Sequence, residues 1–196
     1  MSGAAIILTL TIGISVVGLF SRTVIERTVL RPYAIARGSQ YATLLTSGFV
    51  HADVGHLLFN LITYYSFAFQ LQRVIGDVRF EVLYFSGLLV SNIGTCLKHK
   101  DEPNYAALGA SGAILAVLFA SIVYFPRQRL FILPIPLPIP APLFALAYLA
   151  FSYYSSGRAG DRINHDAHIF GALTGLAFVL ITNPQQFSVL LHSLTG

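Results

Sequence analysis

The sequence predicts an all-α polytopic membrane protein, and three observations support this fold class. The mean hydropathy of the 196 residues is +0.70. Hydrophobic residues make up 55% of the chain and charged residues only 10%, far below the roughly 25% charged residues of a typical soluble domain. The charges also fall in short stretches between long apolar ones. Helices of about 20 residues joined by short loops would give this chain room for roughly six spans.

The apolar stretches predict six transmembrane helices in a single domain that covers residues 1–196. The stretches lie near residues 3–20, 54–72, 80–97, 108–125, 141–154 and 166–181. We expect the first to be an uncleaved span rather than a signal peptide, because no basic residue precedes it and no small-residue cleavage site follows it directly.

A proline run separates the fourth stretch from the fifth. Prolines occupy alternate positions from Pro134 to Pro142. Proline removes a backbone donor and biases the residue before it toward extended geometry. We therefore expect an extended segment at the membrane face, followed by a short fifth span.

The remaining composition excludes some partners. The formal charge is +4, but the basic residues are scattered among loops rather than gathered in one stripe, so we expect them to contact the lipid bilayer and not a nucleic acid. The one cysteine, Cys96, cannot form an internal disulfide.

A serine and a histidine each stand where an apolar stretch begins. Ser111 lies in Gly109-Ala110-Ser111-Gly112, and His168 follows Ala167. Polar side chains within membrane segments are functional candidates, since hydrocarbon disfavours them unless they face protein or water. A serine at a helix start also has unpaired backbone N–H groups and the positive end of the helix dipole beside it, which suit an oxyanion.

Small residues predict that these two helices pack closely. Gly112, Ala116 and Ala120 form one stripe, and Gly171 and Gly175 form another just after His168. Such packing would allow Ser111 and His168 to form a hydrogen bond. A glycine-flanked serine by itself is also common as plain helix-packing material.

A third group of polar residues opens the second stretch. His56 and Asn60 are four residues apart and share a helix face, whereas His51 is out of phase and precedes the helix. Side chains of this kind can donate hydrogen bonds to a developing oxyanion. They could equally bond one another or a loop carbonyl in a purely structural role.

Taken together, these residues resemble the rhomboid family of intramembrane serine proteases from about Tyr41 to Pro184. The matching elements are His51-x4-His56-x3-Asn60, Gly109-x-Ser111-Gly112 and Ala167-His168-x-x-Gly171-x-x-x-Gly175, in this order. The resemblance implies a six-transmembrane-helix, rhomboid-like bundle without a cofactor or metal. It also implies that Ser111 is the nucleophile and His168 the general base, without an acidic third member.

The resemblance further implies an oxyanion site formed by His56, Asn60 and the Ser111 N–H, and cleavage of single-span transmembrane substrates near the outer membrane face. The implied location is the inner or plasma membrane of a cell. The chain departs from many relatives in having no Trp, in carrying Gln72 where a glutamate is often found, and in carrying Leu115 where some have an aromatic residue. Orientation of His168 is then expected to depend on Tyr148, Tyr153 or Tyr154.

The loop charges predict a different orientation in the membrane. The expected active-site side carries Arg22, Arg27, Arg31, Arg37, Lys98, Lys100, Arg158 and Arg162, whereas the opposite side carries only Arg73, Arg79, Arg127 and Arg129. The positive-inside rule therefore favours a cytoplasmic site. We follow the resemblance, since basic residues in a folded loop can anchor lipid headgroups.

Two other functions stay open at this point. A membrane metalloenzyme or metal carrier could use His51, His56, His165 and His168 as ligands, although the Gly-x-Ser-Gly element would then be unexplained. A catalytically inactive relative that binds membrane helices is the other, although such a protein would usually lack the serine or the histidine.

Overall fold

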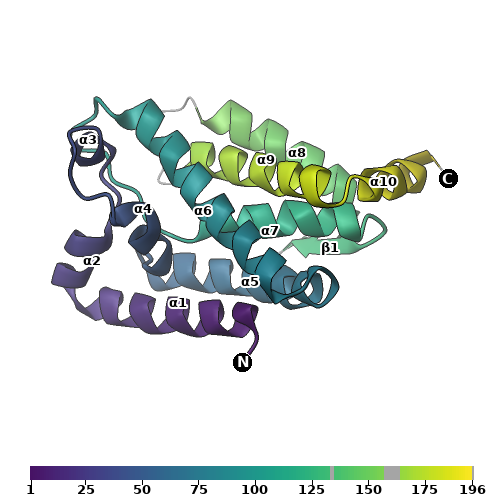
Figure 1. Ribbon diagram of the computed structural model, residues 1–196, viewed down its shortest axis with the longest axis horizontal. Helices are drawn as coiled ribbons and strands as arrows, with labels where there is room; N and C mark the ends of the chain where they lie inside the picture. Colours follow the sequence, from purple (N-terminus) through teal and green to yellow (C-terminus); the bar gives the residue numbers. More distant parts are fainter. Residues whose placement is uncertain (133–134, 157–163, 196) are drawn as a thin grey trace.

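The computed structural model describes residues 1–132, 135–156 and 164–195, and most of them are helical (Figure 1). The long helices are α1 Gly3–Phe20, α5 Val54–Ile75, α6 Asp77–His99, α7 Ser111–Tyr124, α8 Ala141–Ser155, α9 His165–Thr182 and α10 Gln185–Thr195. The short helices are α2 Arg22–Thr28, α3 Pro32–Ile35, α4 Thr43–Thr46 and the 3-10 helix η1 Ser47–Phe49.

A helix lies over each of the six expected stretches, but these helices differ in length and apolarity. Within the described residues, α1, α6 and α9 combine at least 18 residues with the apolarity of a membrane span. Helix α7 is apolar but has 14 residues, which gives about 21 Å at 1.5 Å per residue. A bilayer core is about 30 Å thick. The structure thus contains three candidate spans of full length, and a total of six crossings stays a prediction.

Helix α7 forms the centre of the molecule. Every residue from Gly112 to Val123 is buried, as expected for a helix that is apolar on all sides. It packs against α5, α6 and α9, with α8 and α10 in contact at its margins. Figure 1 shows α2, α3 and α4 gathered at one end of the bundle, and α10 and the strand β1 at the other.

Helices α7 and α9 approach each other most closely at two glycines of α9. A Cβ placed on Gly171 would lie 3.0 Å from the Cα of Gly112, and one on Gly175 would lie 3.0 Å from the Cα of Ala116. From the first pair to the second, both helices advance by four residues in the same direction. The two helices therefore run parallel and begin at the same end. The small-residue stripes predicted from the sequence therefore do face each other.

The proline segment forms a strand rather than an isolated extended piece. Strand β2 (Ile135–Pro140) pairs in an antiparallel manner with β1 (Arg129–Ile132). The extended geometry is thus confirmed from Ile135 to Pro140, while residues 133–134 lie outside the described part. The purely α-helical expectation missed this hairpin, because the isoleucines and leucine between the prolines keep their N–H groups and leave one edge able to pair.

The segment between α1 and α5 is folded onto the start of α7. The amide of Asn92 on α6 donates to the carbonyl of Leu44 (2.8 Å) and to the hydroxyl of Ser47 (3.1 Å). The carbonyl of Ser47 in turn accepts a hydrogen bond from the N–H of Gly109 (2.9 Å). These bonds fix the turn that precedes Ser111.

We predict that Gly175→Ala destabilises the protein, because its new Cβ would meet backbone atoms of α7 that have no rotamer to change. Overpacking of this kind costs about 1–3 kcal/mol. Gly13→Ala in α1 is the matched control, since a Cβ there meets nothing within 4 Å. Thermal unfolding in detergent should give a lower Tm for the first variant alone. Equal Tm values would contradict the close contact.

Candidate active site

Ser111 is the first residue of α7 and is half-buried. Its N–H is among the first four of the helix, which have no partner within the helix. Gly109, two residues earlier, has φ +115°, which side chains with a Cβ rarely adopt. The glycine therefore permits the sharp turn that leads into the helix at the serine.

His168 lies in the first turn of α9 and is also half-buried. Its Nδ1 lies 2.8 Å from the hydroxyl oxygen of Tyr148 on α8. Of the three tyrosines expected to orient the histidine, Tyr148 makes this contact, while Tyr153 and Tyr154 are largely exposed. Because the Tyr148 hydroxyl is bonded to Nδ1, the imidazole is oriented with Nε2 on the side away from the tyrosine.

Ser111 and His168 share one end of the bundle. Ser111 precedes Gly112, whose backbone touches Gly171, and His168 lies one turn before Gly171. Because the helices are parallel, their first turns lie side by side. The parallel register thus places Ser111 and His168 in the first turns of two adjacent helices.

His56 and Asn60 face the turn before Ser111. A Cβ on Gly109 would lie 2.7 Å from Cε1 and 3.0 Å from Nε2 of His56, and 3.8 Å from the amide nitrogen of Asn60. Gly109 thus also leaves room for the imidazole of His56. The face of α5 that carries His56 and Asn60 is therefore adjacent to the start of α7.

Asn60 is hydrogen-bonded to His51, not to His56. The amide nitrogen of Asn60 lies 2.8 Å from Nε2 of His51, and Nδ1 of His51 lies 2.8 Å from the hydroxyl of Ser15 on α1. The Ser15 hydroxyl lies 2.8 Å from the carbonyl of Phe49. A carbonyl can only accept, so Ser15 donates to Phe49 and accepts from Nδ1–H of His51; Nε2 then accepts from Asn60.

This chain of bonds fixes the charge and orientation of His51. Its side chain is fully buried, and burial, with a smaller contribution from the nearby His56, lowers the pKa of His51 to about 3. The imidazole is therefore neutral at physiological pH. The Asn60 amide thus uses one N–H for His51, and its nitrogen lies close to the turn at Gly109.

Ser15 was not predicted from the sequence. A single serine within an apolar stretch gives no signal of its own, since such residues commonly bond the preceding turn of their helix. Only its partner, His51, was singled out, and the two are 36 residues apart.

The histidines do not form a cluster of metal ligands. His165 packs against His168 and Phe151, with ring centroids 5.9 and 5.5 Å apart, and His51 packs edge-on against His56 at 4.9 Å. In the part of the chain that the structure describes, no three His, Cys, Asp or Glu side chains are placed to hold one metal ion.

The model of the Rhomboid domain matches residues 38–185, which is most of the chain and includes every residue of the candidate site except Ser15. The chain belongs to the rhomboid family. Rhomboid membership and the apolar helices together identify it as an integral membrane protein.

Curated relatives agree with this family. A Bacillus subtilis (strain 168) protein, YdcA, named as a candidate rhomboid protease, is 31% identical over 157 residues, which are 78% of this chain and 73% of the relative. The human presenilin-associated rhomboid-like protein, mitochondrial, is 29% identical over 159 residues, or 79% of this chain. The Arabidopsis thaliana RHOMBOID-like protein 12, mitochondrial, is 28% identical over 148 residues, or 66% of this chain. The chain spans only 42% and 43% of the length of these two mitochondrial relatives.

We predict that acid destabilises the protein partly through His51. The folded-state pKa of about 3 lies below the ordinary value of 6.5, so the unfolded chain binds the extra proton and stability falls as pH falls below about 6.5. Each pH unit in that window costs at most about 1.4 kcal/mol. Thermal unfolding of wild type and His51→Asn between about pH 7.5 and pH 4.5 tests this, and parallel pH curves would contradict it.

Proposed function

We propose that this rhomboid is an intramembrane serine endopeptidase that uses Ser111 and His168 as a catalytic dyad. The observation that carries the proposal is the parallel glycine contact between α7 and α9, which sets the first turns of both helices side by side. A nucleophile and a base must approach within hydrogen-bond reach. Rhomboid proteases as a class act on transmembrane substrates within the bilayer, and the family membership supports the same class of substrate here.

We propose that the contact with Tyr148 sets the roles of the two nitrogens of His168. A neutral imidazole that donates Nδ1–H to the Tyr148 oxygen presents Nε2 as the acceptor. Nε2 can then take the proton of Ser111 as its Oγ attacks the peptide carbonyl, and return it to the leaving amine. Water hydrolyses the resulting acyl-enzyme by the same steps in reverse order. Tyr148 thus supplies the orienting contact that an acidic residue supplies in a triad.

The face of α5 next to Gly109 supplies the proposed oxyanion site. As the carbonyl carbon becomes tetrahedral, negative charge develops on its oxygen beside the first turn of α7. The N–H of Ser111, the imidazole of His56 and the second N–H of Asn60 are the donors proposed for this charge. Five residues are proposed to support this site. His51 holds Asn60 by a hydrogen bond. The other four are glycines: Gly109 and Gly112 on either side of the serine, and Gly171 and Gly175 on α9.

We also propose six crossings of the membrane, by α1, α5, α6, α7, α8 and α9. Helix α7 can be shorter than the bilayer core because its residues from Gly112 to Val123 are buried within the protein. The proposed substrates are single-span proteins cut near the outer face, and the proposed location is the inner or plasma membrane.

The basic residues that argue against an outer active site lie only partly within the described residues. Arg158 and Arg162 lie outside the described residues. Within them, Arg37 packs over the ring of Tyr33 at 3.4 Å and donates to the carbonyl of Lys100 (3.3 Å). A folded basic loop of this kind can lie on lipid headgroups, which supports the proposed outer site against the positive-inside count.

We predict that a fluorophosphonate labels the wild-type protein, and that the unlabelled wild-type protein cleaves a single-span model substrate. Ser111→Ala and His168→Ala should lose both labelling and cleavage, because the nucleophile and base act as a unit. Ser121→Ala, at a serine buried in the same helix, is the matched control and should be labelled as wild type.

The same assay tests the other two functions. Loss of activity with a chelator, restored by zinc, would replace the serine mechanism by the histidine-metal one. A folded wild-type protein that is neither labelled nor able to cleave would indicate an inactive member that binds membrane helices.

We predict that His56→Ala and Asn60→Ala keep measurable labelling but lose turnover. Removal of one oxyanion donor costs about 100- to 1000-fold in rate. The kcat should fall more than the substrate affinity, because the oxyanion exists only in the transition state. Thermal stability must be measured alongside. If activity fell only with the folded fraction, the residue would be structural and would leave the proposed site.

A further inference from the structure

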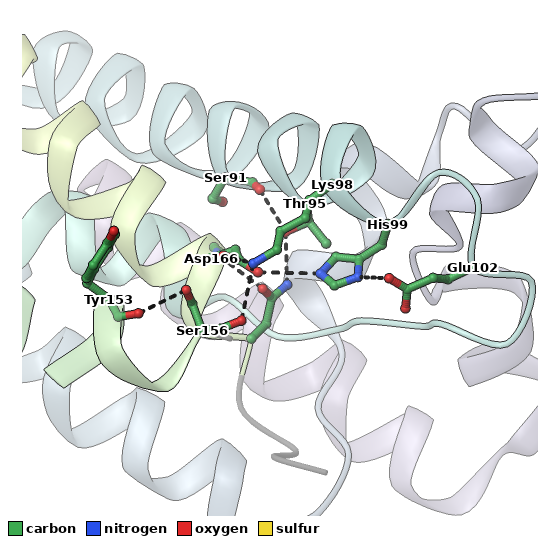
Figure 2. Close-up of polar contacts among 10 residues, drawn as sticks. Ser91, Thr95, Lys98, His99, Glu102, Tyr153, Ser156 and Asp166 are labelled. Atoms are coloured by element: carbon green, nitrogen blue, oxygen red, sulfur yellow. Dashed lines mark hydrogen bonds and ion pairs between the residues drawn. The ribbon is translucent and has the colours of Figure 1, made fainter. Parts of the chain in front are cut away.

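Helix α6 carries a row of polar side chains that ends beside the first turn of α9. Ser91, Thr95, Lys98 and His99 are spaced so that they share one face of the helix. Polar residues on a candidate membrane span are costly unless they are bonded within the protein. Figure 2 shows that this row does have partners, and that Ser156 at the end of α8 and Asp166 in α9 are among them.

Asp166 is the main partner of the row. Its two carboxylate oxygens lie 2.8 Å from Nζ of Lys98 and 3.4 Å from Nε2 of His99 (Figure 2). The side chain of Asp166 is only 13% exposed, whereas that of Lys98 is 44% exposed, so the carboxylate is the better shielded partner of this ion pair. Glu102 bonds the other nitrogen of His99 at 2.9 Å, and Tyr105 stacks on its ring at 3.7 Å, which hold the imidazole in place.

Three further hydrogen bonds hold the same region together. Asn164, the residue that caps α9, donates from its amide to the hydroxyl of Thr95 (2.9 Å) and accepts from the N–H of Ala167 (3.0 Å). Lys98 also donates to the carbonyl of Ser156 at the end of α8 (3.2 Å). Lys98 therefore bonds both to the helix that carries His168 and to the helix that carries Tyr148.

We infer that Asp166, held by Lys98 and His99, is a positioning residue for His168. Asp166 lies two residues before His168 in the first helical turn, and its carboxylate points to α6 rather than to the imidazole. The bonds to α6 set the rotation and depth of that turn, and the bond from Lys98 to Ser156 sets the end of α8 relative to it. The contact between Tyr148 and His168 depends on both helices being held in this way.

The inference rests on the proposed dyad, and the first experiment measures cleavage and fluorophosphonate labelling by full-length variants. Asp166→Asn and Lys98→Met should each lower kcat, with KM little changed, because misplacement of a base by about 1 Å can cost up to about 100-fold. The double variant should lose less than the product of the two single losses, since both single changes remove the same ion pair between Lys98 and Asp166. Lys98→Arg should restore most of the rate.

The matched control is Glu26→Gln, which breaks the exposed ion pair of Glu26 with Arg22 in α2. It should leave kcat and Tm at wild-type values, since exposed pairs contribute little. The inference is overturned if Asp166→Asn keeps the wild-type kcat, if its loss follows the folded fraction alone, or if Lys98→Arg is as slow as Lys98→Met.

A second measurement separates this inference from the proposed function. The imidazole ¹⁵N signals of His168, recorded by NMR on detergent-solubilised protein, report its tautomer and mobility without any turnover. Asp166→Asn should shift or broaden them, while Glu26→Gln should not. If wild type proved inactive, the proposed protease would fail, and a changed His168 signal would still support the positioning role, whereas an unchanged signal would overturn it.

Discussion

The backbone contact between α7 and α9 is the constraint on which the rest of the structure depends. In a bilayer, helices gain little from burying apolar surface against one another, so close packing at small residues is a main source of association. Gly171 and Gly175 provide it here, against Gly112 and Ala116. Because the helices are parallel, their N-terminal ends coincide, and both carry the positive end of a helix dipole. A site that must stabilise negative charge is therefore favoured at this end of the bundle, before any side chain is considered.

Two separate polar networks hold the two sides of that end. On one side, Ser15 and His51 order Asn60 against the turn at Gly109. On the other, Lys98 and Asp166 fasten α9 to α6. The networks share no residue, yet each joins helices that are far apart in sequence. In surroundings of low dielectric a fully bonded network is rigid, whereas a broken one leaves a costly unpaired group. The proposed donors and the proposed base are thus ordered independently of each other.

The sequence predicts the local features of this arrangement and misses those that depend on which helices are neighbours. Ser111 and His168 could be identified because each is a polar residue at the start of an apolar run, and the small-residue spacing predicted the contact between their helices. The hydrogen-bond partner of Asn60 could not be predicted, because two histidines are near it in sequence. His56 lies four residues before it on the same helix, and His51 precedes the helix. Ser15 and Lys98 gave no signal, since a lone serine in a span and a lysine at a helix end usually serve packing and headgroup contact. The β1–β2 hairpin was missed for a related reason, as the proline alternation fixes one strand but says nothing of its partner.

The burial of α7 also bears on how a substrate could be cleaved. Its first turn lies beside α5, α9 and the folded segment between α1 and α5, and polar groups in such a place need one another, water or a substrate carbonyl as partners. A peptide bond within a stable helix offers neither a free carbonyl nor room for attack, because its oxygen accepts the N–H four residues later. For the proposed reaction, the substrate must therefore unwind before its carbonyl can reach Ser111 and the donors on α5. Unwinding is least costly where glycine or proline already weakens the helix. The proposed reaction would thus select substrates by local helix stability as much as by side-chain fit, since the substrate backbone itself must be presented to a site at the start of a helix.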